Sequence, residues 1–211
     1  NAAPDFLLMW DNAYCIHEFD GDFVPFKDIL SECEKYGNAD MVFEFASTSK
    51  VTLPGAGIAC FACSQANMDY MTKLIGVQAI SFDKMNQLRH VKFLQNKEHT
   101  LALMKEHARI LKPKFDMVVS TLEREIAPLG IATWHKPKGG YFVSVNTTPG
   151  LAKRTLALCK EAGVVMTSAG ATYPYGHDPL DSNIRVAPSL PPVEELEQAM
   201  AVFCCCLTLA G

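Results

Sequence analysis

Short apolar runs that end in polar loops recur along the chain and predict its strands. Residues 6–10 form the first run, which stops at Asp-Asn, and residues 41–46 form the second, which stops at a polar loop with glycine and proline. A continuous apolar run of this length is typical of a buried parallel strand. By the same criterion we expect further strands at 58–62, 131–135, 141–145, 164–167 and 184–187.

Helical spacing of apolar residues fills most of the intervals between these runs. The longest helical stretch covers 83–125, where Pro113 is expected to bend or divide it. We expect shorter helices at 26–36, 65–74, 151–162 and 193–206. Strands that alternate with helices predict an α/β fold. The long helical stretch divides the chain near residue 95, and the three strands before that point have few helices to cover them.

Composition and charge are those of a globular protein without a strongly charged surface. The 211 residues are 49% hydrophobic and carry a net charge of −4, so no basic excess favours nucleic acid or an anionic membrane surface. No stretch reaches the roughly 18 uncharged apolar residues that suggest a membrane span. The N-terminus lacks the pattern of a signal peptide. We expect a cytoplasmic protein and, since an initiating methionine is missing, a piece of a longer chain.

The eight cysteines do not predict a metal site. Cys60 and Cys63 form one CxxC motif, but no second pair lies at zinc spacing. The consecutive cysteines 204–206 cannot all face one metal from a helix. We therefore expect free thiols in apolar surroundings, in a reducing compartment.

Three polar motifs follow or occupy the expected strands. They are Asp-Asn-Ala-Tyr at 11–14, Ser-Thr-Ser-Lys at 47–50 and Asn-Ile-Arg at 183–185. In α/β sheets, ligands bind beyond the carboxyl ends of strands, where the first two motifs lie. Each motif alone has an ordinary explanation, because an aspartate can cap a turn, a loop lysine can be solvated, and a strand arginine can pair with an acid. Their order and spacing favour one shared site.

These motifs, together with the segment 47–59, Gly-Gly-Tyr-Phe at 139–142 and Asn-Ile-Arg-Val-Ala-Pro at 183–188, resemble class I/II aminotransferases of pyridoxal-phosphate (PLP) fold type I. Within that family the chain is most similar to the aspartate aminotransferase-like subgroup, sometimes called MocR-like. The resemblance covers essentially the whole chain. It implies part of the large-domain mixed sheet in 1–95, and a long connecting helix with the α/β C-terminal small domain in 96–211. It also implies that about half of the enzyme, on the N-terminal side, is absent and that the isolated piece is inactive.

The resemblance implies a role for each residue of the first two motifs. Lys50 would form the Schiff base with PLP and move a proton between the substrate Cα and C4′. Asp11 would keep the pyridine nitrogen protonated through a charge-assisted hydrogen bond of about 1.5–3 kcal/mol, which makes the ring a better electron sink. Tyr14 would donate to the phenolate oxygen O3′. Ser47 and Ser49 are the candidates for hydrogen bonds to the phosphate.

Two arginines are the candidates for substrate binding. Arg185 would clamp the α-carboxylate with two N–H groups, a task that lysine performs less well. Arg89 would reach the active site of a partner subunit and contact a substrate carboxylate or the phosphate. A solvated basic helix face explains Arg89 equally well, and the same alternatives stay open for His90. Ile58 departs from the family, because many class I enzymes have a phosphate-binding arginine eight positions after the lysine.

The function implied is that of an aminotransferase that moves an amino group between an amino acid, first of all aspartate or glutamate, and a 2-oxo acid. We expect a homodimer without nucleic-acid or membrane partners. A C–S lyase or decarboxylase on the same scaffold would need the same lysine, aspartate, tyrosine and arginine. A PLP-sensing domain of a MocR-type transcription regulator is a further alternative, although no helix-turn-helix accompanies it in these 211 residues.

Overall fold

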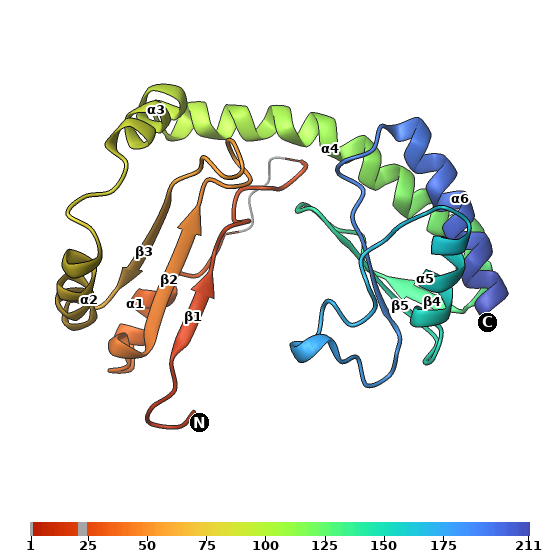
Figure 1. The fold of residues 1–211 in the computed structure, drawn as a ribbon, viewed down its shortest axis with the longest axis horizontal. Coiled ribbons are helices and arrows are strands. Elements are labelled where there is room, and N and C mark those ends of the chain that lie inside the picture. The colour runs from red at the N-terminus through yellow and green to blue at the C-terminus, as the bar shows by residue number, and fades with distance from the viewer. Residues whose placement is uncertain (1, 21–24) are drawn as a thin grey trace. The chain divides into compact units, whose positions relative to one another are not determined.

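The computed structural model describes residues 2–20 and 25–211, which divide into two compact units (Figure 1). Of the described residues, 2–17 and 25–104 form unit 1, and 18–20 and 105–211 form unit 2. Each unit contains one three-stranded sheet. The assignment of 1–95 and 96–211 to a large and a small domain stays a prediction.

A mixed sheet forms the centre of unit 1. Strand β1 (Leu8–Asp11) runs parallel to β2 (Val42–Ser47), and β3 (Ala59–Cys63) is antiparallel to β2. Asp11 lies opposite Phe45 in this register. Because β1 and β2 are parallel, their carboxyl ends lie at the same edge of the sheet.

Three helices of unit 1 begin at side-chain caps, namely α1 (Ile29–Lys35), α2 (Gln65–Gln78) and α3 (Lys84–Leu94). The short η1 (Ala39–Met41) has no side-chain cap. The side chains of Asp28, Ser64 and Asp83 each accept a hydrogen bond from the backbone N–H three residues later. Such caps satisfy N–H groups of the first turn that no helix carbonyl can reach.

Burial of the first strand was predicted wrongly. Leu7 is 56% exposed and Met9 is 70% exposed. Strand β1 lies at the end of its sheet and pairs only with β2. An apolar run therefore identifies the strand and its parallel partner, but the described elements do not cover its exposed side chains.

The long helical stretch is divided at a different place from the one expected. Helix α4 (Lys97–Glu125) continues through Pro113, so this proline does not divide the stretch, and a bend at Pro113 stays a prediction. The break lies at Gln95, whose φ is 57°. The Asn96 side chain then accepts a hydrogen bond from the His99 N–H at 2.8 Å and starts the next helix.

Unit 2 is built on an antiparallel sheet in the order β4-β5-β6. Its elements after α4 are η2 (Ala127–Leu129), β4 (Ala132–Trp134), β5 (Val143–Thr147), α5 (Ala152–Glu161), η3 (Pro174–Gly176), β6 (Asn183–Val186) and α6 (Val193–Ala210). Val143 and Val145 of β5 point into a core that also contains Phe115, Leu122 and Phe203. Helices α4 and α6 thus bury their apolar faces against this sheet.

The strand expected at 164–167 is absent. The Val164 N–H instead donates to the Cys159 carbonyl at 2.8 Å, just after the end of α5. Val165 is 82% exposed, and β5 takes β4 and β6 as its two neighbours. A β-branched segment without a ladder partner does not become a strand.

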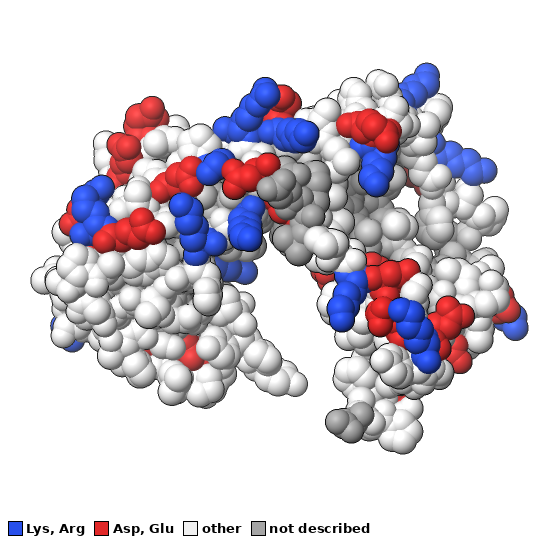
Figure 2. Space-filling model, turned by 180° about the vertical axis from the view of Figure 1, so that it is seen from behind, with Lys and Arg blue, Asp and Glu red and all other residues white. Residues whose placement is uncertain are grey.

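Charged side chains are mixed in sign on the face shown in Figure 2, where acidic and basic groups alternate without forming a broad patch. In the part of the chain that the structure describes, no helix is both long and apolar enough to cross a membrane.

Candidate functional site

The turn after β1 fixes Asp11 at the edge of the unit 1 sheet. Its carboxylate accepts a hydrogen bond from the Ala13 N–H at 3.1 Å. The Asn12 N–H donates to the Phe45 carbonyl at 2.8 Å, and its side chain donates to Glu44 at 3.1 Å. The two bonds of Asn12 continue the pairing of β1 with β2 beyond the last residue of β1. Asp11 is therefore held in place by the strand before it and by Asn12 after it.

The loop that carries Lys50 begins where β2 ends. The Thr48 N–H donates to the Ile58 carbonyl at 2.9 Å, which closes the loop at its base. Within it, the Ser47 and Ser49 hydroxyls lie 3.2 Å apart. Lys50 is exposed. The loop therefore places an amine and two hydroxyls close to the carboxyl end of β2.

His17 joins the segment after β1 to the lysine loop. Its ring is buried, and its Nε2 lies 3.3 Å from the Lys50 carbonyl oxygen. A carbonyl only accepts, so Nε2 carries the proton in this contact. The ring of Tyr14 meets the ring of His17 at a centroid distance of 5.5 Å and an interplanar angle of 61°. Tyr14 and Lys50, expected to share a site, are thus connected through one histidine.

Helix α3 contacts the same loop from another direction. The buried ring of His90 lies within hydrogen-bond distance of the Thr48 and Thr52 hydroxyls. The Asn86 side chain donates to the Gly57 carbonyl at 3.2 Å. Arg89, the neighbour of His90 in sequence, is exposed.

Gly57 is closely packed against the start of the same loop. A Cβ atom there would lie 3.1 Å from the Thr48 Oγ1 and 3.3 Å from the Ser49 nitrogen. Ile58 follows in the position where many class I enzymes have an arginine, and its N–H donates to the Thr48 hydroxyl at 3.0 Å. The two ends of the loop are therefore in direct contact, which limits how the residues between them can move.

Arg185 belongs to β6 in unit 2. Its guanidinium lies over the ring of Phe142, 4.5 Å from the centroid, in a cation–π contact. Its Nε is buried and has no hydrogen-bond partner among the described residues. A guanidinium held by a ring face keeps its N–H donors available for a carboxylate.

A polar network positions the strand that carries Arg185. The Asn183 side chain donates to the Ser144 hydroxyl at 2.9 Å and to the Asn146 side-chain oxygen at 2.8 Å. The Thr172 hydroxyl donates to Asn183 at 2.6 Å. These contacts link β5, β6 and the loop 169–176, whose two tyrosines, 173 and 175, are exposed.

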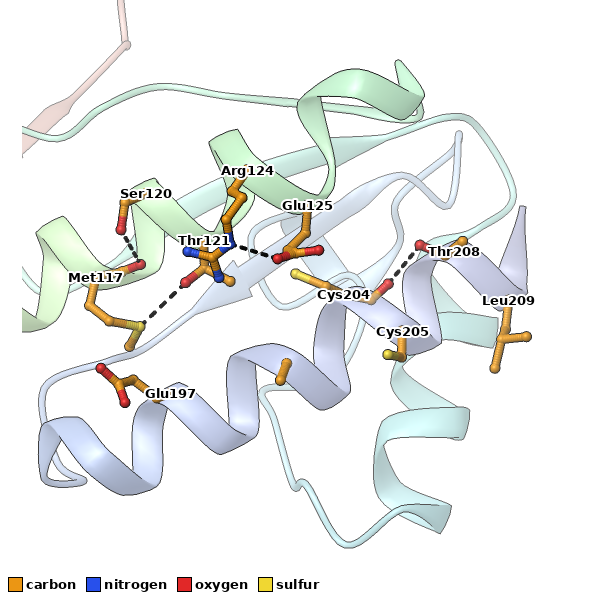
Figure 3. A pocket seen from close by; sticks show the side chains of 11 residues that line it. Met117, Ser120, Thr121, Arg124, Glu125, Glu197, Cys204, Cys205, Thr208 and Leu209 are labelled. Atoms are coloured by element: carbon orange, nitrogen blue, oxygen red, sulfur yellow. Dashed lines mark hydrogen bonds and ion pairs between the residues drawn. The ribbon is translucent and has the colours of Figure 1, made fainter.

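A groove between α4 and α6 in unit 2 has a different character (Figure 3). Its volume is about 720 Å³. Each contact drawn in Figure 3 joins two residues of the same helix. On α4, Arg124 and Glu125 form an ion pair at 2.6 Å, and on α6 the Thr208 hydroxyl donates to the Cys204 carbonyl at 2.9 Å. These contacts pair no nucleophile with a base, and the groove offers no arrangement typical of catalysis.

Sequence reasoning placed Asp11 and Lys50 at one sheet edge but missed the residues that hold them. The sequence assigned no positioning role to His17, Thr48 or Gly57. The two histidines contact residues 33 to 42 positions away along the chain. The pattern of neighbouring residues in the sequence does not reveal contacts over such a separation. Only the spacing of Asn86 and His90, one helical turn apart, hinted that both side chains face the same neighbour.

Comparison with known sequences shows a match over the whole chain. The family described as aspartate amino-transferase matches residues 1–211. An aspartate aminotransferase of Corynebacterium glutamicum is 44% identical over 210 residues, which are 100% of this chain and 49% of that protein. The chain spans about half the length of the curated relatives that it matches.

Solved structures share the fold. The crystal structure of an aspartate transaminase from Corynebacterium glutamicum has a TM-score of 0.97 and 44% identity, over 100% of this chain and 50% of that one. LysN, an α-aminoadipate aminotransferase from Thermus thermophilus, has a TM-score of 0.77 at 18% identity, over 97% of this chain and 50% of that one, a likeness of fold alone. These matches confirm the expected fold class. The chain belongs to the aspartate aminotransferase family, as its motifs predicted.

Proposed function

We propose that the full-length protein is a PLP-dependent aminotransferase in which Lys50 binds the cofactor covalently. The observation that carries this proposal is the fixed lysine loop at the sheet edge where Asp11 also lies, with His17 joining the Lys50 carbonyl to the segment of Tyr14. An amino acid and a 2-oxo acid are the substrates we propose, with aspartate or glutamate as the first amino donors to test. The 44% identity to an aspartate aminotransferase supports that choice.

The donor groups at this edge suit the cofactor. When bound, PLP withdraws electrons from the substrate Cα and so lowers the cost of removing its proton. Lys50 supplies the primary amine, and Asp11 supplies a carboxylate for the protonated ring nitrogen. Tyr14 offers a phenol to the ring oxygen. The adjacent hydroxyls of Ser47 and Ser49 suit a phosphate.

The structure of LysN is an example of this fold with a phosphopyridoxyl compound bound. That protein was crystallised with N-(5′-phosphopyridoxyl)-L-leucine, and its fold matches this chain over 97% of the residues. Arg185 is the proposed carboxylate clamp, because its guanidinium is held by Phe142 and its Nε lacks a hydrogen-bond partner among the described residues. Arg89 is proposed to act on the active site of a second copy in a homodimer. We place the protein in the cytoplasm.

The test is covalent trapping in the full-length protein. Wild type, Lys50→Ala and the control Lys73→Ala, an exposed lysine on α2, are incubated with PLP and treated with borohydride. Mass spectrometry of the digested protein then reports which lysine carries the cofactor. We expect labelling of Lys50 in wild type and in Lys73→Ala, and loss of that label in Lys50→Ala. A wild-type protein that carries no label on Lys50 contradicts the proposal.

Product analysis separates the reactions that share this scaffold. Accumulation of a 2-oxo acid, matched by amination of the second substrate, supports transamination. Release of ammonia and pyruvate indicates a C–S lyase, and release of carbon dioxide indicates a decarboxylase. A protein that binds PLP on Lys50 yet turns over no amino acid is the result expected of a sensing domain.

A further inference from the structure

The histidine on α3, His90, lies within hydrogen-bond distance of three groups through its two ring nitrogens. The Nδ1 of His90 lies 2.9 Å from the Asn86 carbonyl oxygen, four residues earlier in the same helix. Because a carbonyl only accepts, Nδ1 carries the proton, and in a neutral ring Nε2 is then an acceptor. The ring is only 7% exposed. The ring of His90 thus contacts the loop in a defined orientation and as a defined tautomer.

Two threonine hydroxyls converge on the acceptor nitrogen. The Oγ1 atoms of Thr48 and Thr52 lie 3.1 Å and 2.9 Å from the Nε2 of His90. Thr48 already accepts the Ile58 N–H at 3.0 Å, and its nearest acceptor for its own proton is this nitrogen. Thr52 has a second acceptor in the Thr48 carbonyl at 3.2 Å. The Nε2 atom has one lone pair and accepts a proton from one hydroxyl at a time, and the other hydroxyl then donates to a loop carbonyl, Thr52 to that of Thr48 at 3.2 Å or Thr48 to that of Ile58 at 3.5 Å.

These two threonines flank Lys50 in the sequence. Thr48 lies two residues before the lysine and Thr52 two residues after it, so His90 fixes the backbone on both sides of the amine. Asn86, one turn earlier in α3, fixes the far end of the loop through the Gly57 carbonyl. We propose that His90 is a positioning residue: it holds Thr48 and Thr52 so that the Lys50 amine is presented in one geometry to the cofactor. This inference rests on the proposed function, because it assigns a purpose to the loop that carries Lys50.

A positioning role differs from a catalytic one in what it predicts. His90 acts on Lys50 through the side chains of Thr48 and Thr52, each of which lies two residues from the lysine along the chain. Its loss leaves the amine in place but allows the loop to sample other geometries, and misplacement of a reacting group by about 1 Å can cost about a hundredfold in rate. Loss of His90 should therefore change the order of the loop before any cofactor binds, and should lower kcat more than it changes KM.

The experiment compares His90→Leu, His90→Gln and Thr52→Val in the full-length protein with wild type. His99→Leu is the matched control, because His99 is an exposed histidine in the first turn of α4. Amide hydrogen exchange of the cofactor-free protein is followed over residues 48–58. Steady-state kcat and KM, and the pH titration of the absorbance of the PLP-loaded protein, provide the second readout.

We expect exchange over 48–58 to be about tenfold faster in His90→Leu, which corresponds to the loss of a buried hydrogen bond. Thr52→Val should show a smaller increase, since Thr48 still reaches the ring. His90→Gln should recover part of the protection, because an amide oxygen near the former Nε2 position accepts from a threonine hydroxyl. We also expect kcat to fall about tenfold or more in His90→Leu with KM within about threefold of wild type.

Each outcome bears on one of the two proposals. Exchange and absorbance titration that match wild type in both His90→Leu and Thr52→Val overturn the positioning role, even if Lys50 binds PLP normally. Wild-type protein without cofactor on Lys50 overturns the proposed function, and the exchange measurement then decides the role of His90 in the loop alone. If His90→Leu does not fold, His90→Gln and Thr52→Val carry the comparison.

Discussion

At the scale of single residues, burial decides which cysteines can react. All eight cysteines are free. Burial, followed by the nearby Cys206, raises the pKa of Cys159 to about 12. Burial also raises the pKa of Cys204 to about 11. The thiolate is the nucleophilic form, so these core thiols are inert at neutral pH while they stay buried.

Neighbouring cysteines on α6 provide a direct test. Cys205 is exposed, whereas Cys204 is buried and its pKa is raised. We expect iodoacetamide at about pH 8 to modify Cys205 at least about tenfold faster than Cys204 in the native full-length protein. Peptide mass spectrometry after timed quenching measures both rates in one sample. Equal rates in the native protein, rather than only after unfolding in urea, would contradict the burial of this helix face.

At the scale of elements, a single carboxylate organises the approach to β6. The two oxygens of Asp178 accept hydrogen bonds from the N–H groups of Leu180, Ser182 and Asn183 at 3.0, 2.8 and 2.8 Å. These bonds, the one from Asn183 first, hold the pKa of Asp178 below its usual value. Since β6 carries Arg185 two residues further on, this turn also fixes the proposed carboxylate clamp.

The sign of the resulting pH dependence follows from the lowered pKa. The ionised form of Asp178 is favoured in the folded state, so its contribution to stability is complete above the usual aspartate pKa of about 3.9. That contribution is lost as the pH falls through the lower pKa of the folded state. We expect Asp178→Asn to be less stable than wild type at neutral pH. The difference between the two should shrink as the pH falls from about 5 to about 3.

Urea unfolding of the full-length proteins at a series of pH values measures this difference. Asp5→Asn is the control, since Asp5 is exposed near the N-terminus, and its curve should run parallel to that of wild type. A constant difference between wild type and Asp178→Asn across the whole acid range would show that the carboxylate charge does not matter at this turn.

How much of the fold the sequence predicted depends on whether each element has its own local signal. The expected strands at 41–46 and 58–62 match β2 and β3 within one residue at each end, because apolar runs bounded by turn residues are local features. The expected strand at 164–167 failed because a strand needs a partner, which the pattern of one segment does not reveal. Helix α4 tolerates Pro113 because tertiary packing outweighs the propensity of one residue.

The candidate site divides in the same way. The order of strands and motifs was enough to place Asp11 and Lys50 at one edge, because parallel strands end together. His17 and His90 could not be assigned, since their partners come from other parts of the chain and their tautomers depend on those partners. Arg89 and Arg185 remain predictions, and the first depends on a second copy of the chain.

At the scale of the whole molecule, apolar surface is distributed unevenly between the units. The main buried cluster belongs to unit 2. In unit 1, large apolar side chains of the β1 strand and of the segment between α2 and α3 are exposed, among them Ile80 at 106% and Phe82 at 63%. Patches of this kind in isolated polypeptides lead to association.

We therefore expect the isolated polypeptide 1–211 to self-associate and to lack transaminase activity. Light scattering coupled to size-exclusion chromatography measures the association. Met9→Lys, a charge on the exposed edge strand, should reduce it, because lysines on edge strands oppose pairing with a second chain. A sharp monomer peak with cooperative unfolding, or transamination at rates near those of full-length relatives, would count against this expectation.

Residues 18–20 belong to unit 2, although they lie far from the rest of it in the sequence. This segment restricts where the chain can be cut or joined to a homologue. The ring of Phe19 packs on Phe115 at a centroid distance of 4.7 Å, and its N–H donates to the Lys138 carbonyl at 2.8 Å. A recombinant 105–211 would lose this ring and leave the facing side of Phe115 uncovered. A chimaera of two homologues joined at residue 104 within α4 would likewise take Phe19 and Phe115 from different parents. A chimaera therefore needs residues 18–20 and 105–211 from the same parent, although more than eighty residues separate them in the reading frame.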